Sequence, residues 1–104
     1  MGENIGVNDI GYYAIIPAKV FFNKDLNSNE KILYGLVSLL LNEKGYCTAT
    51  NSYLGEALNV SPRTVSRWIS KINKLDFFKV FFLKSKTGEI LERRIYIKNT
   101  PIEN

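Results

Sequence analysis

The sequence contains no histidine and only one cysteine, Cys47, among its 104 residues. Catalytic groups of the Ser-His-Asp and Cys-His types need a histidine base, and zinc sites need several Cys or His ligands. The seven glycines are scattered singly, so there is no glycine-rich loop of the kind that holds a nucleotide phosphate. No pair of carboxylates suited to acid–base catalysis stands out either. These absences predict a protein that is not an enzyme and that binds neither a cofactor nor a metal.

The sequence also lacks a long apolar run. The longest, residues 36–41, is six residues long and is interrupted by Ser38, whereas a membrane-spanning helix needs about 20 apolar residues. Residues 1–8 are polar and do not show the basic-then-apolar pattern of a secretory signal. A lone cysteine, which we expect to be buried and unreactive, forms no internal disulfide and fits a reducing compartment. We therefore expect a cytoplasmic protein with no membrane partner.

The apolar fraction of 45% is enough for one folded domain, and the charge is unevenly distributed along it. Residues 59–98 hold ten Lys or Arg against three acidic residues, a formal charge of +7. The rest of the chain holds four Lys against seven acidic residues, a formal charge of −3. A molecule polarised in this way presents its basic half to a polyanion, although a solvated basic face gives the same composition. The position of the cations on the fold decides between these two interpretations.

The order of the expected helices and strands is that of a winged helix-turn-helix domain. This is an α+β fold with three helices, a C-terminal β-hairpin wing and a short N-terminal strand. The domain is expected at residues 12–98, between an N-terminal tail at 1–11 and a linker or C-terminal tail at 99–104. The expected elements are an edge strand or extended arm at 12–16, an extended or single-turn connector at 18–22, helices at 28–43, 51–58 and 61–75, a short strand at 46–48, and hairpin strands at 77–83 and 90–97.

Capping and turn residues mark the ends of the first two helices. Asn27 or Ser28 is expected to cap the first helix, and Gly45 to end it in a left-handed conformation. Asn51 is the expected cap of the second helix. Asn59 tolerates the positive φ that the following tight turn needs.

The segment from Ser61 to Leu75 has two faces of different chemistry. Serine followed by proline is a strong helix start, because proline at the first helical position loses no hydrogen bond. One set of residues recurs at helical spacing and is expected to face the core: Val65, Trp68, Ile69, Ile72 and Leu75. The tryptophan is therefore expected in the core rather than stacked on a nucleic-acid base. About 200° of helix rotation away lies a small or cationic set: Arg63, Ser66, Arg67, Ser70 and Lys74. Solvated helices usually mix charges of both signs, and this one has no acidic residue, so we favour a DNA-binding face.

The exposed set suits duplex DNA for chemical reasons. Serines and Thr64 are small enough to let the helix approach closely in a major groove about 12 Å wide. Arg63 or Arg67 can bind the O6 and N7 acceptors of guanine with two parallel hydrogen bonds, which lysine cannot do. Free backbone N–H groups at the helix N-terminus can receive a phosphate, and Lys71 and Lys74 are expected to meet phosphates rather than bases.

The hairpin that follows is expected to act as a basic wing. Lys84 and Lys86 lie near its turn, and only one of Arg93 and Arg94 can face the duplex, because adjacent strand residues point to opposite faces. Phosphate or minor-groove contacts are expected from this tip. The predicted DNA-contacting residues are Ser61, Arg63, Thr64, Ser66, Arg67, Ser70, Lys71, Lys74, Lys84, Lys86 and Arg93.

Four phenylalanines of the hairpin come in consecutive pairs, Phe77-Phe78 and Phe81-Phe82. Each pair therefore places one ring on either face of the strand. The core takes one set, and the other covers the first strand or forms an interface. An exposed aromatic patch here would indicate a homodimer.

Three strings carry a family resemblance: YYAIIPAKV, LNSNEKILYGLVSLLLNEKGYCTATNSYL and NVSPRTVSRWISKINKL. Together they make the stretch from Tyr12 to Leu75, about two thirds of the chain, similar to the N-terminal helix-turn-helix domain of phage and plasmid replication initiator, or replisome-organiser, proteins. The resemblance implies an origin-binding domain, followed in such proteins by a second domain that recruits helicase-loading machinery, so replisome proteins are expected partners. RTVSRWI is shared widely among winged-helix regulators and identifies the fold more than the biology. Relatives usually carry a glycine after the recognition helix, where this chain has Asp76-Phe77-Phe78.

The leading hypothesis is sequence-specific binding of double-stranded DNA at a replication origin of a phage, plasmid or other mobile element. The first alternative is a transcriptional regulator with the same fold, which a long dimerising helix or an effector domain would favour. The second is a protein-docking winged helix without DNA binding. That alternative predicts an apolar hairpin and a recognition face without cations.

Overall fold

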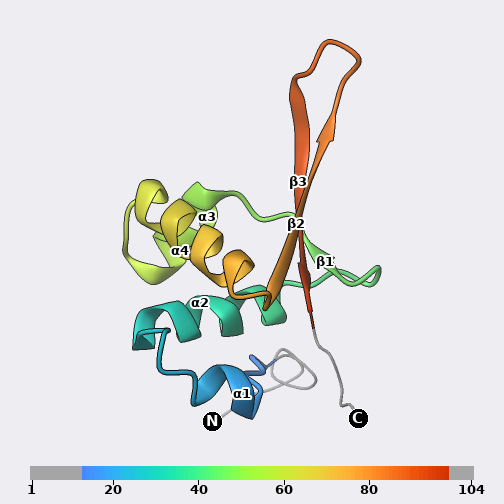
Figure 1. The fold of residues 1–104 in the computed structure, drawn as a ribbon. Coiled ribbons are helices and arrows are strands. Elements are labelled where there is room, and N and C mark those ends of the chain that lie inside the picture. The colour runs from blue at the N-terminus through green and yellow to red at the C-terminus, as the bar shows by residue number, and fades with distance from the viewer. Residues whose placement is uncertain (1–12, 99–104) are drawn as a thin grey trace, which may run out of the picture.

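The computed structural model describes residues 13–98, which form four helices and a three-stranded antiparallel sheet. Figure 1 shows the helices packed beside and below the sheet, with a β-hairpin rising beyond them. The predicted α+β winged helix-turn-helix fold is confirmed, while Tyr12 and the predicted tails at 1–11 and 99–104 lie outside the described residues. The elements are α1 (Ala18–Phe21), α2 (Ser28–Leu39), β1 (Tyr46–Cys47), α3 (Asn51–Leu58), α4 (Pro62–Lys74), β2 (Phe78–Lys84) and β3 (Ile90–Ile97).

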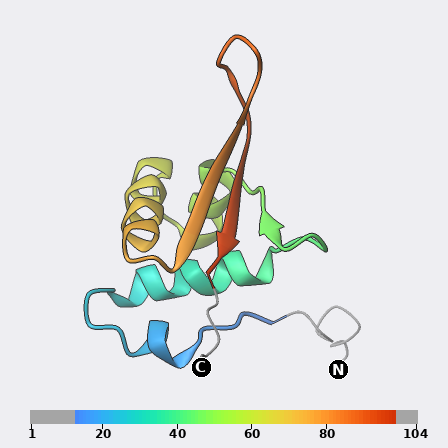
Figure 2. The same cartoon turned by 45° about the vertical axis from the view of Figure 1, so that its right-hand side comes forward.

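The central strand of the sheet is β3, with β1 and β2 on either side. β1 is short, and pairs only Tyr46 with Tyr96 and Cys47 with Ile95. β2 pairs with β3 along its whole length, with an irregularity near the turn. From Ile95 toward its turn, the hairpin therefore consists of β2 and β3 alone. This two-stranded ribbon projects past the helices in Figure 2. We call this ribbon, residues 81–94, the wing.

The core lies where α2, α3 and α4 meet the base of the sheet. The ring of Tyr34 from α2 stacks on that of Phe78 from β2, with 5.5 Å between centroids and 8° between planes. Cys47 is fully buried, as predicted, and burial raises the pKa of its thiol. The buried apolar residues are Val20, Leu26, Leu33, Tyr34, Val37, Cys47, Leu54, Val65, Ile69, Ile72, Phe78 and Ile95.

The second phenylalanine pair of the hairpin separates onto the two faces of the sheet, as predicted, but the first pair does not: Phe77 lies just before β2 and packs, partly buried, against the same core as Phe78. Phe78 faces the core and is buried, and Phe82 lies further out on the same face with half of its ring exposed. Phe81 lies on the outer face and meets the ring of Tyr96 edge-on, with 5.6 Å between centroids. The core thus takes the rings near the base, and both faces of the wing keep an exposed ring.

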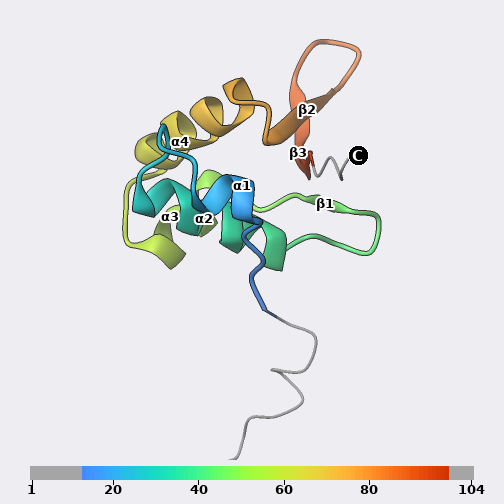
Figure 3. The same ribbon diagram turned by 60° about the horizontal axis from the view of Figure 1, so that its bottom comes forward.

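The N-terminal part of the described chain is an extended arm rather than an edge strand. Residues 13–17 carry no strand pairing, and the N–H of Ile15 donates to Ser38 Oγ of α2 at 2.8 Å. The expected connector is a single helical turn, α1, whose Val20 is buried. In Figure 3 α1 lies in front of α2, and the Nζ of Lys31 in α2 is 5.8 Å from the ring centre of Phe21 in α1. The structure therefore has four helices where three were predicted, because this turn is long enough to count as one.

The prediction that the first helix runs from residue 28 to residue 43 was wrong at its end, since this helix, α2, ends at Leu39. Asn42 supplies the physical reason. Its side-chain oxygen accepts hydrogen bonds from the N–H groups of Lys44 (2.9 Å) and Tyr46 (3.1 Å). A side chain that offers nearby backbone donors a local acceptor competes with the helix and favours a turn.

Two predicted caps were also wrong. Gly45 has the positive φ of 92° expected of a left-handed residue, but it lies in the turn before β1 and does not cap α2. Thr50 caps α3, because its side chain accepts from the N–H of Tyr53 at 3.1 Å. Asn51 is instead the first helical residue, so its side chain is available for a contact elsewhere in the fold.

The turn between α3 and α4 brings two stretches of backbone into close contact. Asn59 adopts the predicted left-handed conformation, with φ 60°. The N–H of Val60 then donates to the carbonyl oxygen of Gly55 at 2.8 Å. A Cβ atom on Gly55 would lie only 2.5 Å from the carbonyl oxygen of Val60. Glycine is therefore required here to set the angle between the two helices.

We expect Gly55→Ala to lower the free energy of unfolding by about 1–3 kcal/mol, because the added methyl group meets backbone that cannot move aside. Urea denaturation measures the change. Gly35→Ala is the control, since the atoms nearest to its new Cβ are side-chain atoms, of Ile16 at 3.2 Å and of Ala14 at 3.3 Å, rather than backbone. Gly55→Ala with wild-type stability would contradict the close approach of the two backbones.

Candidate nucleic-acid interface

α4 turns one face to the core and the other to solvent. Val65, Ile69 and Ile72 are buried, and Trp68 and Leu75 are partly buried against the same core. The predicted inward positions are therefore confirmed, including the tryptophan. The opposite face consists of exposed residues from four successive turns: Arg63, Ser66, Arg67, Ser70 and Lys74.

The first turn of α4 is ordered by its own side chains. Ser61 is the cap and Pro62 the first helical residue, both as predicted. Ser61 Oγ accepts from the N–H of Thr64 and donates to its Oγ1, both at 3.1 Å. Arg67 Nη2 donates to the same Thr64 Oγ1 at 3.5 Å, so its side chain lies along the helix. Arg63 makes no hydrogen bond or ion pair within residues 13–98 and is free to reach a ligand.

Lys71 is placed differently from the other cations of α4. Its Nζ lies 3.1 Å from Glu30 Oε1, and Glu30 is only 4% exposed. The same carboxylate oxygen accepts from the N–H of Asn27, which caps α2 as predicted. Lys71 therefore joins α4 to the start of α2, and its contact with a phosphate stays a prediction.

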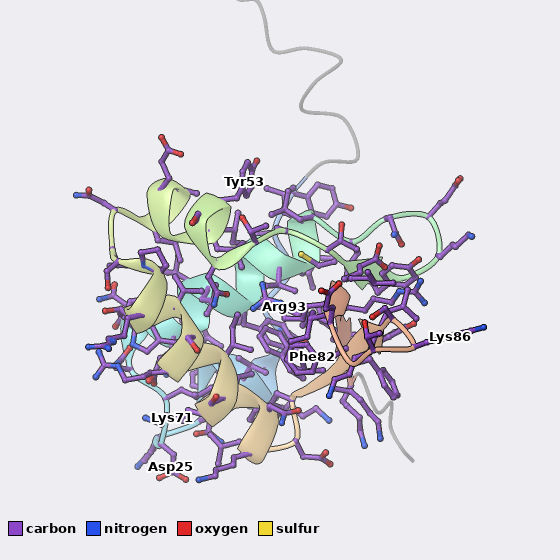
Figure 4. The ribbon with its side chains drawn as sticks, turned by 90° about the horizontal axis from the view of Figure 1, so that it is seen from above. Asp25, Tyr53, Lys71, Phe82, Lys86 and Arg93 are labelled. Carbon is purple, nitrogen blue, oxygen red and sulfur yellow. The ribbon has the colours of Figure 1, made fainter. Side chains whose placement is uncertain are left out.

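A groove runs between α4 and the hairpin. Its volume is about 190 Å³ and its floor is Ile69 and Val80. Viewed from above in Figure 4, Arg93 and Phe82 point from the hairpin toward the helices. The helix contributes two of the predicted DNA-contacting serines, and the full lining is Ser66, Ile69, Ser70, Asn73, Val80, Phe82 and Arg93.

The two adjacent arginines of β3 point to opposite faces, as predicted. Arg93 is on the helix side, where its Nη1 donates to Asn51 Oδ1 at 2.5 Å and its Nη2 to the carbonyl oxygen of Ala49 at 2.6 Å. Burial lowers the pKa of its guanidinium, which as an arginine still carries its charge at neutral pH. Arg94 is on the outer face, where its Nε donates to Glu92 Oε2 at 2.6 Å and its guanidinium lies 4.6 Å from the ring centre of Tyr46.

The tip of the wing is an ordered basic turn. Ser85 organises it: its N–H donates to the carbonyl oxygen of Glu89 at 2.8 Å, and its hydroxyl accepts from the N–H groups of Thr87 and Glu89. Lys84 and Lys86 are exposed and make no ion pair within the described part of the chain. Figure 4 shows Lys86 extending away from the body of the molecule.

Comparison with protein-family models matches residues 24–77, just over half of the chain, to a family described as a helix-turn-helix domain. The chain belongs to this helix-turn-helix domain family. The match covers α2, α3 and α4 and ends before β2, so it includes the exposed face of α4 and leaves the wing outside. Membership supports DNA binding as the general function of the domain. Searches of curated proteins and of solved structures found no match.

Sequence reasoning missed one contact of this helix-turn-helix domain, that of Arg93 with Asn51 and Ala49. These residues lie more than 40 positions apart in the sequence, and no local pattern links them. Asn51 was predicted to cap α3, so its side-chain oxygen was not considered as an acceptor for Arg93. Within residues 13–98 this half-buried arginine has no carboxylate partner, and its contacts appear only when the strand and the helix are placed together.

Two other properties of the helix-turn-helix domain follow from residues 13–98. Within that range no helix is long and apolar enough to cross a membrane. In the same described residues no three His, Cys, Asp or Glu side chains lie close enough together to hold a metal ion.

We expect Lys71→Gln to lower the free energy of unfolding by about 1–2 kcal/mol, because it leaves the buried Glu30 carboxylate with one charged partner fewer. Lys74→Gln removes the same charge from the exposed face and is expected to change stability by less than about 0.5 kcal/mol. Thermal and urea denaturation of the two variants side by side check this. Equal stability of the two would show that the Lys71–Glu30 pair contributes nothing.

Proposed function

We propose that this helix-turn-helix domain binds double-stranded DNA in a sequence-specific manner, with α4 in the major groove. The observation that carries the proposal is the solvent face of α4. Every charged residue on it is a cation, and its remaining residues are serines small enough to permit close approach to base edges. A docking surface for a protein is expected to lack these cations.

The geometry supports a division of roles along the helix. Arg63 has no partner within residues 13–98 and can donate two parallel hydrogen bonds to a guanine edge. Arg67 is held along the helix by Thr64 and would exchange that weak contact for one with DNA. Lys74 and the wing lysines, Lys84 and Lys86, are suited to phosphates, because flexible ammonium groups neutralise charge without fixing a base. The proposed role is binding alone, with no chemical step.

The biological setting that we propose is recognition of a replication origin in a phage, plasmid or other mobile element. Its support is the sequence resemblance of residues 12–75 to replication initiator domains. On this proposal the DNA-bound domain would serve replisome or helicase-loading proteins as its partners. A transcriptional regulator with the same fold would use the same DNA-binding face, so the two roles differ in where the target sites lie.

The double substitution Arg63→Gln/Arg67→Gln is expected to weaken binding to a selected duplex by about tenfold or more, because each bidentate contact to guanine contributes about 1–3 kcal/mol. Fluorescence anisotropy with a labelled duplex, titrated at several salt concentrations, measures the loss. Lys44→Gln/Lys79→Gln is the matched control. It removes the same charge from the turn before β1 and from the outer face of the sheet, and is expected to bind within about twofold of wild type. Wild-type protein that binds no duplex even at low salt would contradict the proposed function.

Selection of binding sites from a random duplex library is expected to return one short motif containing guanine, and replacing that guanine should cost about 1–3 kcal/mol. Mapping the motif onto the genome that encodes the chain then tests the setting. Repeated copies within an origin of replication support the replication role. Single copies upstream of promoters would replace it with transcriptional regulation.

A further inference from the structure

We infer that Arg93 is a positioning residue, which fixes the wing at a set angle to α4 and does not itself bind phosphate. Its effect on DNA affinity rests on the proposed function, whereas its effect on the wing does not. The sequence alone places Arg93 among the DNA contacts.

The wing is a poorly supported element. The third strand of the sheet, β1, reaches only as far as Ile95, so residues 81–94 form an isolated two-stranded ribbon. Such a ribbon is marginally stable in water unless something packs against it. Phe82 lines the groove, but half of its ring is exposed. The residues from Thr87 to Leu91 are all exposed. The wing therefore needs a second anchor on its helix side.

Arg93 supplies that anchor at the start of α3. Its two terminal nitrogens donate to Asn51 Oδ1 and to the carbonyl oxygen of Ala49, which belong to the segment that leads from β1 into the helix. A planar guanidinium held by two acceptors permits one orientation, which a lysine ammonium could not impose. Because α3 is joined to α4 by the tight turn at Asn59 and Val60, the bond fixes the wing relative to the recognition helix as well.

Direct phosphate binding fits these contacts less well. Both terminal nitrogens of Arg93 are already bonded to neutral acceptors, and its side chain is half-buried in the groove wall. Lys84 and Lys86 at the tip are exposed, unpaired within residues 13–98, and better placed to meet a phosphate. Arg93 then acts through them, since it determines where they lie.

Amide hydrogen exchange of the free protein tests the anchor without DNA. Arg93→Gln is expected to speed exchange of wing amides, residues 81–94, by about tenfold, while amides of α2 and α4 keep their wild-type protection. Arg94→Gln is the matched control, since it removes the neighbouring guanidinium from the outer face and should leave the helix-side anchor in place. Asn51→Ala should reproduce part of the Arg93→Gln effect. Wing exchange that is unchanged in Arg93→Gln would overturn the inference.

Anisotropy on the selected duplex separates positioning from contact. If Arg93 positions the wing, Arg93→Gln and Lys84→Gln/Lys86→Gln will be non-additive, because each removes the same wing contacts. If Arg93 binds a phosphate itself, independently of the wing lysines, the losses of Arg93→Gln and Lys84→Gln/Lys86→Gln will add. That additive result would overturn the inference. A wild-type protein without duplex affinity would contradict the proposed function, and the exchange experiment would still decide the role of Arg93.

Discussion

The structure depends on the burial of one face of α4 against α2 and the base of the sheet. Val65, Ile69 and Ile72 lose nearly all contact with solvent in that packing, and each buried side chain of this size contributes about 1.5–3 kcal/mol. Since a helix is rigid, fixing this face also fixes the direction of the opposite one. The cationic surface of the domain is thus a consequence of where the apolar residues go.

The wing has no comparable core beneath it. Its base is part of the sheet, but its outer part is a ribbon that relies on Phe82 in the groove and on Arg93 at the start of α3. The angle between the wing and the recognition helix therefore depends on these few contacts and not on a core. The two basic surfaces of the domain are thus held in different ways, α4 by the core and the wing by the contacts of Phe82 and Arg93.

The outer face of the sheet carries aromatic rings and cations of its own. Tyr96 lies between Tyr46 and Phe81, and Arg94 and Lys79 cover the ends of this row. Phe81 remains half exposed, and an exposed aromatic patch on this hairpin would indicate a homodimer. A homodimer built on this patch stays a prediction. Burying the patch would leave the solvent face of α4 uncovered, because the two lie on different sides of the sheet.

Local chemistry in the sequence determined the elements and the faces of α4. Ser61-Pro62 started the helix, Asn59 made the turn, and strict 3.6-residue spacing separated the buried from the exposed residues, all of which are properties of neighbouring residues. The sequence misjudged the ends of α2 and the cap of α3, because Asn42 and Thr50 compete with the helix through single side-chain bonds that several nearby residues could equally make. Only the tertiary structure decided which cations are free: it joined Lys71 to the buried Glu30 and Arg93 to Asn51, across about 40 residues of sequence. Such pairs form because the folded core brings distant segments together. The periodicity of the sequence describes only neighbouring residues, so it does not predict which distant residues meet.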